Sequence, residues 1–326
     1  MADGKPVIVS TSPGFGKHGR VPELIAERGW EFITCTDTSK PDGGVSEHIG
    51  RADALVVGLV PVTPETLEQG GKLKAVIKHG VGVDNIDIPA CTAAGLPVCN
   101  TPAANADAVA ELAVGLMFSM ARWIPQGHVS VTGGGWDRRI GTQLGGKTLG
   151  IVGLGNIGKR LAKLARGLGM QVVATDMYPD EAFAAEHGVT FLSLEELLGQ
   201  SDYVSLHVFG GADNAALINE DTLALMKPDA KLINLARGEV VDLDAVVAAL
   251  DADRLGGVAI DAYVSEPPDT THPIFSHPRA VFTPHSGADT KEALENVGLM
   301  VIESLDAVLA GETPPRMLNA KELASR

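Results

Sequence analysis

The sequence predicts an α/β protein made of two doubly wound parallel-sheet domains with a cleft between them. Its 326 residues are enough for two domains at roughly 100–200 residues each. Short, continuously apolar segments alternate with helical stretches, which is typical of strands buried on both faces of a parallel sheet. The strand candidates are residues 7–9, 54–57, 75–77, 148–152, 171–175, 203–208, 232–235, 258–260 and 281–282.

Helices are expected between these strands. In the first half they are predicted at residues 21–28 and 63–69. In the second half, Ser193 and Glu196 form a capping box that predicts a helix start. Residues 242–255 place several apolar side chains on one helical face.

Two further helices bear on how the domains are connected. Residues 106–120 are apolar on nearly every side and predict a helix buried all round, as between two domains. Residues 291–310 are amphipathic and are expected to pack back on the first domain. We therefore predict a discontinuous substrate domain of residues 1–101 plus 289–326, and a cofactor domain of residues 102–288.

The composition excludes several classes of partner. With 26 basic and 41 acidic residues, the net charge of −15 repels nucleic acid and anionic lipid. The longest apolar stretch, residues 108–121, is too short to cross a bilayer, so no membrane role is expected. Three cysteines without a close pair, and a start unlike a signal peptide, favour reduced thiols in the cytoplasm. Neither a CxxC nor an HExxH pattern occurs, so no metal site is expected.

A glycine-rich loop predicts a dinucleotide site on a Rossmann-like domain. Residues 153–158 read Gly-Leu-Gly-Asn-Ile-Gly, between the strand candidate 149–152 and a helix candidate at 157–168. Glycines let the backbone approach a pyrophosphate, and the helix start supplies N–H groups and positive dipole. The next strand candidate, 171–175, ends at Asp176, where a carboxylate can bind the ribose hydroxyls. The alternative interpretation is a glycine turn, as found in any α/β sheet.

Asp176 also bears on which dinucleotide is bound. Its carboxylate would repel a 2′-phosphate, and Met177 and Tyr178 supply no arginine to bind one. The sequence therefore favours NAD over NADP.

Four separated signatures carry a resemblance to a known family. They are the 153–158 loop, the run from Asn234 to Gly238 with Asp242, Asp261 with Glu266-Pro267, and Thr283-Pro284-His285. In this order and spacing, the chain resembles the D-isomer-specific 2-hydroxyacid dehydrogenases over nearly its whole length. The resemblance implies that Arg237, Glu266 and His285 form the catalytic set.

The chemistry of such a reaction suits these residue types. Hydride transfer to a ketone leaves negative charge on its oxygen, and histidine can donate the proton that neutralises it. Glu266 would stabilise the imidazolium of His285, and the planar fork of Arg237 would bind the substrate carboxylate and polarise the keto oxygen. Taken singly, each residue could instead be an ordinary loop residue.

The resemblance also implies a set of cofactor contacts. For Asp261 two interpretations stay open, a place near the nicotinamide carboxamide or a cap of its own turn. Phe209 departs from the proline usual in the family. The implied cofactor-binding residues are Gly153, Gly155, Asn156, Ile157, Gly158, Asp176, His207, Ala236, Asp261 and Gly287.

The substrate side is expected in the first half of the chain. The run from Lys78 through His79, Gly80 and Val81 resembles the family's substrate loop, and its glycines suit an anion-binding nest of N–H groups. Arg237 and His285 would complete the contacts to substrate. Asn105 is a further candidate, with the alternative that it caps the following helix.

These segments look most like those of 3-phosphoglycerate dehydrogenases. Many of those enzymes carry basic residues near the loop that here, at residues 57–61, is apolar. No regulatory domain follows Arg326, so serine-type feedback is not expected. The substrate is expected to be a 2-hydroxy or 2-keto acid of the 3-phosphoglycerate, glycerate/hydroxypyruvate, glyoxylate or sulfolactate type, with the identity and preferred direction left open.

The sequence also leads to expectations about the oligomeric state and about alternative functions. The resemblance implies a homodimer formed through the NAD-binding domain, with residues 123–144 as the pairing arm. A non-catalytic, NAD-sensing protein of the corepressor type is the alternative, and the intact catalytic set favours an enzyme. A formate dehydrogenase is disfavoured because Thr283 stands where those enzymes have glutamine.

Overall fold

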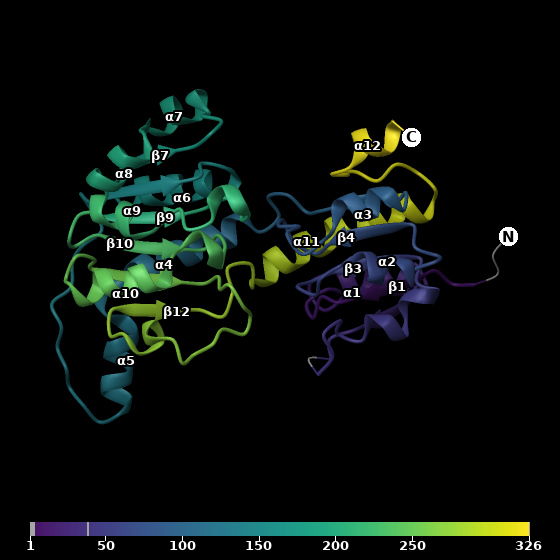
Figure 1. The fold of residues 1–326 in the computed structure, drawn as a ribbon, viewed down its shortest axis with the longest axis horizontal. Helices are drawn as coiled ribbons and strands as arrows, with labels where there is room; N and C mark the ends of the chain where they lie inside the picture. The colour runs from purple at the N-terminus through teal and green to yellow at the C-terminus, as the bar shows by residue number, and fades with distance from the viewer. Residues whose placement is uncertain (1–3, 38, 326) are drawn as a thin grey trace. The chain divides into compact units, whose positions relative to one another are not determined.

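The computed structural model describes residues 4–37 and 39–325, which form two compact units (Figure 1). The first unit combines Met1–Asn105 with Asp289–Arg326, and the second is Ala106–Ala288. The predicted break at residues 101 and 102 lies four residues before the observed break. Residues 1–3, 38 and 326, which the predicted substrate domain includes, lie outside the described residues.

The first unit is a five-stranded parallel sheet in the order β2-β1-β3-β4-β5. Alternate residues of each strand enter two separate cores, so that Val9 lies in one core and Ile8 in the other. This two-sided burial explains the continuously apolar runs in the sequence. The strands are β1 (Val7–Ser10), β2 (Glu31–Thr34), β3 (Ala54–Val57), β4 (Ala75–Lys78) and β5 (Val98–Cys99).

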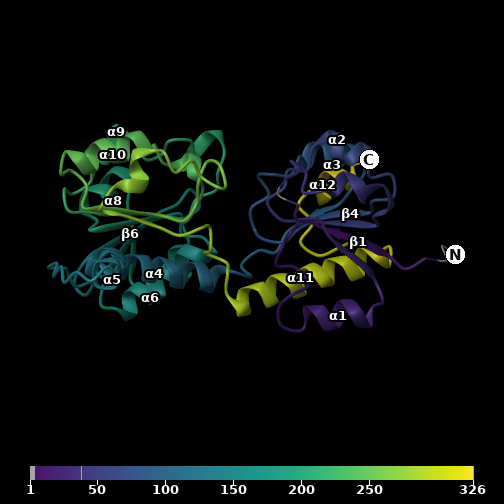
Figure 2. The same ribbon diagram turned by 90° about the horizontal axis from the view of Figure 1, so that it is seen from below.

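Helices cover both faces of this sheet. Figure 2 shows α1 and α11 on one face and α2, α3 and α12 on the other. The bounds are α1 (Val21–Glu27), α2 (Pro64–Glu68), α3 (Ile88–Ala93), α11 (Lys291–Leu309) and α12 (Ala320–Ala324), with short 3₁₀ turns η1 (Val45–Glu47) and η2 (Ile49–Arg51).

The second unit is a seven-stranded parallel sheet in the order β12-β11-β10-β9-β6-β7-β8. The chain leaves β6 toward β7 and β8 and then returns to the other side of β6, which makes the β6–β9 boundary a topological switch point. Its strands are β6 (Thr148–Val152), β7 (Gln171–Thr175), β8 (Val189–Phe191), β9 (Tyr203–Leu206), β10 (Lys231–Asn234), β11 (Gly257–Ile260) and β12 (Ala280–Phe282).

This sheet also carries helices on both faces, with α4 and α6 on one and α8, α9 and α10 on the other (Figure 2). The prediction of two doubly wound parallel-sheet units is therefore confirmed. The bounds are α4 (Ala106–Arg122), α5 (Ile124–Thr132), α6 (Asn156–Gly167), α7 (Glu181–His187), α8 (Leu194–Gln200), α9 (Glu220–Leu225) and α10 (Leu243–Asp251), with 3₁₀ turns η3 (Ala212–Asn214), η4 (Gly238–Val240) and η5 (Pro273–Ser276).

One expectation about α4 is wrong. The helix buries Val109, Leu116 and Met117, but Asp107 and Glu111 on its opposite stripe are exposed. The exposed stripe was not recognised in the sequence because the helix is rich in alanine, which occurs on buried and exposed faces alike. Asp107 instead pairs with Arg160 of α6 at 2.7 Å.

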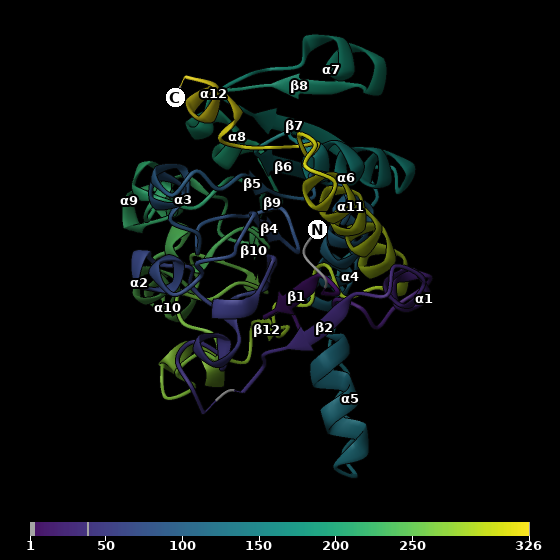
Figure 3. The same cartoon turned by 90° about the vertical axis from the view of Figure 1, so that its right-hand side faces the viewer.

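Helix α5 extends away from the sheet, as Figure 3 shows. It follows α4 after a bend of 62°, and among the described residues this bent pair alone has the combined length and apolar composition of a membrane span. Within residues 4–37 and 39–325, no single helix is long and apolar enough to cross a membrane.

Three short strands were not predicted: β2, β5 and β8. They lie at the edges of the two sheets. Edge strands are short and exposed on one side, so they lack the continuous apolar run of a central strand.

Truncating a buried side chain of α4 should destabilise the second unit. Met117 is fully buried in the core that α4 and α6 share, so Met117→Ala should cost about 2–5 kcal/mol of unfolding free energy. Urea denaturation followed by circular dichroism measures the loss. Leu164→Ala, at a 38% exposed position of α6, is the control, and equal losses in the two variants would contradict this assignment of the core.

Candidate active site

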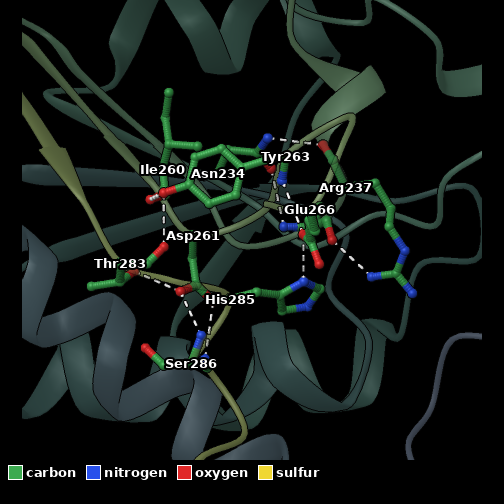
Figure 4. Close-up of polar contacts among 11 residues, drawn as sticks. Asn234, Arg237, Ile260, Asp261, Tyr263, Glu266, Thr283, His285 and Ser286 are labelled. Atoms are coloured by element: carbon green, nitrogen blue, oxygen red, sulfur yellow. Dashed lines mark hydrogen bonds and ion pairs between the residues drawn. The ribbon is translucent and has the colours of Figure 1, made fainter. Parts of the chain in front are cut away.

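Three predicted residues gather at one edge of the second unit's sheet. Arg237 follows β10, Glu266 follows β11 and His285 follows β12. These strands are parallel neighbours, so their carboxyl ends share an edge. Figure 4 shows the three side chains next to one another.

His285 and Glu266 form a direct hydrogen-bonded pair. The distance from Nδ1 of His285 to Oε1 of Glu266 is 2.6 Å, and the side chains are 36% and 24% exposed. The backbone N–H of Tyr263 also donates to Oε1 of Glu266 at 3.2 Å, which fixes the carboxylate. Within the described part of the chain, Nε2 of His285 has no hydrogen-bond partner, so it is left for a ligand.

The electrostatics of the pair favour the charged forms. The hydrogen bond from Glu266 raises the pKa of His285 above its ordinary value of 6.5, although burial and the charge of Arg237 oppose this. Burial alone would raise the pKa of Glu266, but the hydrogen bond and charge of His285, with that of Arg237, leave it lowered. The site therefore stabilises an imidazolium beside a carboxylate.

Asp261 holds the loop that carries His285. Its buried carboxylate, 2% exposed, accepts from the hydroxyl of Thr283 at 2.6 Å and from the backbone N–H groups of Ser286 at 2.8 Å and Gly287 at 3.0 Å. Between them His285 has a φ of +51°, a left-handed conformation uncommon for a non-glycine residue. These contacts do not cap the turn of Asp261 itself, because all three donors lie in the loop after β12.

Arg237 stands on a turn built by Asn234. The buried Asn234 side chain donates to the carbonyl of Arg237 at 2.8 Å and accepts from the N–H of Ala236 at 3.0 Å. The guanidinium of Arg237 donates to the carbonyl of Ala236 at 2.8 Å. At Gly238 a Cβ would lie 2.1 Å from the backbone of Tyr263, so only glycine lets the two loops approach.

Sequence reasoning missed Tyr263 as a member of the site. Its hydroxyl donates to the carbonyls of Thr283 at 2.8 Å and Ile260 at 3.2 Å, which joins the Glu266 segment to the His285 loop. Burial and nearby carboxylates raise the pKa of Tyr263 to about 12. No signal in the sequence marked it, because a single tyrosine in a loop has no pattern.

The glycine loop after β6 fits a dinucleotide. Gly153 has a φ of +95°, and a Cβ there would lie 2.7 Å from the carbonyl oxygen of His207. At Gly158 a Cβ would lie 2.4 Å from the carbonyl oxygen of Gly153, whereas a Cβ at Gly155 would meet nothing within 4 Å. The loop is thus packed against its own unit but open at Gly155. Asn156 and Ile157 begin α6 there, where helix N–H groups point outward.

The remaining predicted cofactor residues lie along the same edge. Asp176 accepts from the N–H groups of Leu154 at 2.7 Å and Tyr178 at 2.8 Å, which places its carboxylate against the glycine loop. Burial lowers the pKa of His207 to about 4, and its Nδ1 is buried without a partner in the described residues. Ala236 is buried. A Cβ added at Gly287 would lie 3.1 Å from Oδ2 of Asp261.

In the first unit, the predicted substrate loop follows β4. The buried Lys78 directs Nζ to the carbonyl of Gly58 at 2.6 Å and to Oδ1 of Asn85 at 2.7 Å. Asn85 in turn donates to the carbonyls of Gly58 at 3.0 Å and Val60 at 2.8 Å. These contacts direct the ammonium of Lys78 into the unit, where it ties the 58–60 loop to the loop after β4.

The backbone after Lys78 suits an anion. The carbonyl of Gly80 accepts from Thr101 N–H at 3.0 Å, and that of Val81 accepts from Asn100 Nδ2 at 2.8 Å. Within the described residues, the N–H groups of residues 80–83 have no hydrogen-bond acceptor. Backbone N–H groups without an acceptor are available to bind an anion.

The other two predicted substrate residues are packed inward. Nδ1 of His79 lies 3.1 Å from the hydroxyl of Ser12, and its ring packs edge-on against Phe15. Burial, with the nearby charges of Lys78 and His18, lowers the pKa of His79 to about 4. Oδ1 of Asn105 is buried without a partner in the described residues, so this oxygen does not cap α4.

A family comparison matches more than half of the chain. A model described as the NAD binding domain of D-isomer specific 2-hydroxyacid dehydrogenases matches residues 114–287. These residues fall within the second unit, which carries the glycine loop, Arg237, Glu266 and His285.

Individual proteins extend this similarity to the first unit. A D-3-phosphoglycerate dehydrogenase of Synechocystis is 37% identical over 84% of this chain and 52% of that protein. A glyoxylate reductase of Thermococcus litoralis is 37% identical over 94% of this chain and 96% of that protein. The solved structure of the TT0316 protein of Thermus thermophilus matches with a TM-score of 0.87 and 32% identity, covering 96% of this chain and 99% of the other. The chain spans about half the length of the phosphoglycerate dehydrogenases it matches.

Removing the carboxylate charge at position 266 should lower the pKa of His285. In Glu266→Gln the amide cannot stabilise the imidazolium, while burial still disfavours it, so the pKa should fall from its raised value toward or below 6.5. An NMR titration of the imidazole protons measures the change. Glu195→Gln, at an exposed position of α8, should leave the titration unchanged, and an unaltered His285 pKa in Glu266→Gln would disprove the coupling.

Proposed function

The chain belongs to the D-isomer specific 2-hydroxyacid dehydrogenase family, and we propose that it transfers a hydride between NAD and the carbinol carbon of a small, anionic D-2-hydroxy acid. The observation that carries the proposal is the 2.6 Å pair of His285 and Glu266, with the charge of Arg237 acting on both. This arrangement provides a proton donor and a carboxylate-binding group at one edge of the sheet.

The cofactor assignment is NAD, whose nicotinamide ring supplies or accepts the hydride when bound. The start of α6 and the open space at Gly155 would hold its pyrophosphate, and Asp176 would bind the ribose hydroxyls. Because the Asp176 carboxylate already lies against the glycine loop, a 2′-phosphate would meet negative charge there. The same contacts favour NAD over NADP.

We propose that His285 moves the proton of the reaction. In the reductive direction, its imidazolium donates from Nε2 to the substrate oxygen as negative charge develops on that atom. In the oxidative direction, the neutral imidazole removes the proton of the hydroxyl group. Glu266 keeps Nδ1 bonded and the ring oriented, and its charge keeps imidazolium populated to a higher pH than in an isolated histidine.

Anionic substrate would be held by groups of two kinds. Arg237 offers a planar fork to the carboxylate and polarises the keto oxygen. The N–H groups of residues 80–83, which have no acceptor among the described residues, offer a second anion-binding element in a loop tied by Asn100 and Thr101. In this proposal Lys78 and His79 support that loop from within, because both are packed inward.

The substrate class is a small 2-hydroxy or 2-keto acid. One of the similar proteins is named for 3-phosphoglycerate, a 2-hydroxy acid, and another for glyoxylate, a 2-oxo acid, and the two compounds also differ in the group beyond the reacting carbon. The relatives reported above are named as a dehydrogenase and a reductase, which gives no support to the NAD-sensing corepressor alternative.

Oxidation of NADH in the presence of 2-keto acids tests the proposal directly. Absorbance at the NADH band should fall with at least one of hydroxypyruvate, glyoxylate, 3-sulfopyruvate and phosphohydroxypyruvate. NADH binding without turnover of any of the four would reject the enzyme and favour the sensor.

The cysteines support a proposal about the compartment. Cys35, Cys91 and Cys99 are buried free thiols, and burial raises the pKa of each. Such thiols are typical of a reducing compartment, and we propose the cytoplasm.

Assembly is proposed to be a homodimer through the second unit. Helix α5 and the segment after it expose large apolar side chains, among them Trp136 at 79% and Ile140 at 98%. Exposed apolar groups gathered on one projecting element are typical of an interaction surface. A second copy of this chain is the partner that the family resemblance implies.

Replacing the proton donor should abolish turnover but not cofactor binding. His285→Ala should lower kcat by about 10²–10⁴-fold because no other group supplies the proton at that position. Steady-state kinetics and an NADH fluorescence titration separate the two effects. The exposed His128→Ala is the control, and near-normal turnover in His285→Ala would show that another group is the donor.

A charged residue in the apolar arm of residues 123–144 should dissociate the proposed dimer. Light scattering should give the mass of two chains for the native protein and of one chain for Ile140→Asp, because a carboxylate would be buried unpaired in the interface. Leu318→Asp, in the first unit and 42% exposed, should stay dimeric. A monomeric native protein would contradict the proposed assembly.

A further inference from the structure

The loop after β3 presents an exposed apolar side chain beside the proposed anion-binding loop of the first unit. Leu59 in this loop is 65% exposed. In the register of the sheet, Val57 of β3 is paired with Lys78 of β4. Leu59 and Gly80 each lie two residues beyond that pair. Neighbouring strands are roughly 4.8 Å apart, so Leu59 follows its strand next to the N–H groups that begin at Gly80.

Hydrogen bonds keep the two loops together beyond the strands. Nδ2 of Asn85 donates to the carbonyls of Gly58 at 3.0 Å and Val60 at 2.8 Å, the residues on either side of Leu59. Nζ of Lys78 donates to the same Gly58 carbonyl at 2.6 Å. The backbone around Leu59 is therefore held from both sides by side chains from β4 and the loop that follows it.

The neighbours of Leu59 are packed into the unit. A Cβ added at Gly58 would lie 2.7 Å from the carbonyl oxygen of Thr11, so no side chain fits there. A Cβ added at Gly43 would lie 3.3 Å from Cγ2 of Val60, so the Val60 side chain packs against the segment that contains Gly43. A single exposed leucine is ordinary on a protein surface. The place of this one, beside N–H groups available to an anion, connects it with the substrate.

Several cations near this loop are committed to other partners. Nζ of Lys78 points into the unit, where it also donates to an amide oxygen at 2.7 Å. Burial lowers the pKa of His79 to about 4, so its ring is neutral near pH 7. Lys40 forms ion pairs with Asp37 at 3.6 Å and with Glu47. These three groups are therefore poorly placed to bind a second anionic group of a substrate.

The loop after β1 carries its cations along α11. Arg20 pairs with Glu295 of α11 at 3.4 Å. At Gly19 a Cβ would overlap the Glu295 side chain, so the segment that contains Lys17 and His18 ends against that helix. The loop after β3 leads instead into α2, on the opposite face of the sheet (Figure 2).

We propose that Leu59 contacts the group beyond the reacting carbon, and that the substrates are 2-keto and D-2-hydroxy acids in which this group is small and apolar, such as methyl or ethyl. The inference rests on the proposed function, in which the N–H groups of residues 80–83 hold the carboxylate. A phosphate or sulfonate beside Leu59 would lose water without gaining a cation. An apolar group would instead be removed from water, which is favourable.

Titration calorimetry on the full chain saturated with oxidised NAD, which cannot reduce a keto acid, tests this preference. 2-Oxobutyrate should bind at least tenfold more tightly than phosphohydroxypyruvate. Leu59→Ala should weaken binding of 2-oxobutyrate about threefold to tenfold but leave glyoxylate, which has only hydrogen beyond the reacting carbon, unchanged. Equal losses for these two acids, tighter binding of phosphohydroxypyruvate by the native protein, or no binding of 2-oxobutyrate would overturn the proposal.

A charge at position 59 provides the converse test. Leu59→Arg should shift the ratio of the two affinities toward phosphohydroxypyruvate by about tenfold or more, because a guanidinium binds phosphate and an apolar group loses its contact. Leu318→Arg, at another exposed leucine of the first unit, should leave the ratio unchanged. A ratio that does not change in Leu59→Arg would show that the group beyond the reacting carbon lies away from this loop.

Oxidation of NADH separates this inference from the proposed function. Faster turnover of phosphohydroxypyruvate than of 2-oxobutyrate, judged by kcat/KM, would keep the dehydrogenase and overturn the inference. Absence of turnover with every keto acid would reject the dehydrogenase. The calorimetric comparison of the native protein, Leu59→Ala and Leu59→Arg would then still decide whether Leu59 contacts the bound acid.

Discussion

The hydrogen bonds of the buried Asp261 carboxylate are the interaction on which the arrangement of the catalytic residues depends. It lies at the end of β11 and accepts hydrogen bonds from Thr283, Ser286 and Gly287, on either side of His285. These bonds help to hold His285 in a left-handed backbone conformation, which is unfavourable for a residue with a side chain. The position of the imidazole relative to Glu266 therefore depends on a carboxylate that touches neither of them.

The parallel arrangement of the strands determines which loops meet throughout the second unit. Neighbouring parallel strands end at one edge, so loops far apart in the sequence meet there. Glycines then set how closely the loops approach, as at Gly153 against His207 and at Gly238 against Tyr263. The same register gathers the strand beginnings at the opposite edge of the sheet, where Lys147, Tyr203 and Lys231 line a cavity.

Much of the site was predictable because its residues follow apolar strands in recognisable motifs. Gly153, Asp176, Arg237, Glu266 and His285 all lie where the sequence places them, at strand ends of one sheet. Other contacts were not predictable. Lys78 was expected at the substrate, but its ammonium bonds to Gly58 and Asn85 inside the unit. Tyr263 had no motif at all, although it joins two loops of the site.

The sequence by itself determined the alternation of strands and helices, the glycine loop and the order of the catalytic motifs, because burial on two faces and close backbone approach each require particular residue types. Only the tertiary structure decided how side chains share hydrogen bonds. The Asp261 carboxylate bonds the loop after β12, and the Lys78 ammonium bonds the carbonyl of Gly58, in each case 20 or more residues away in the sequence. No local pattern encodes such pairings, because they arise only when separate strands are brought side by side.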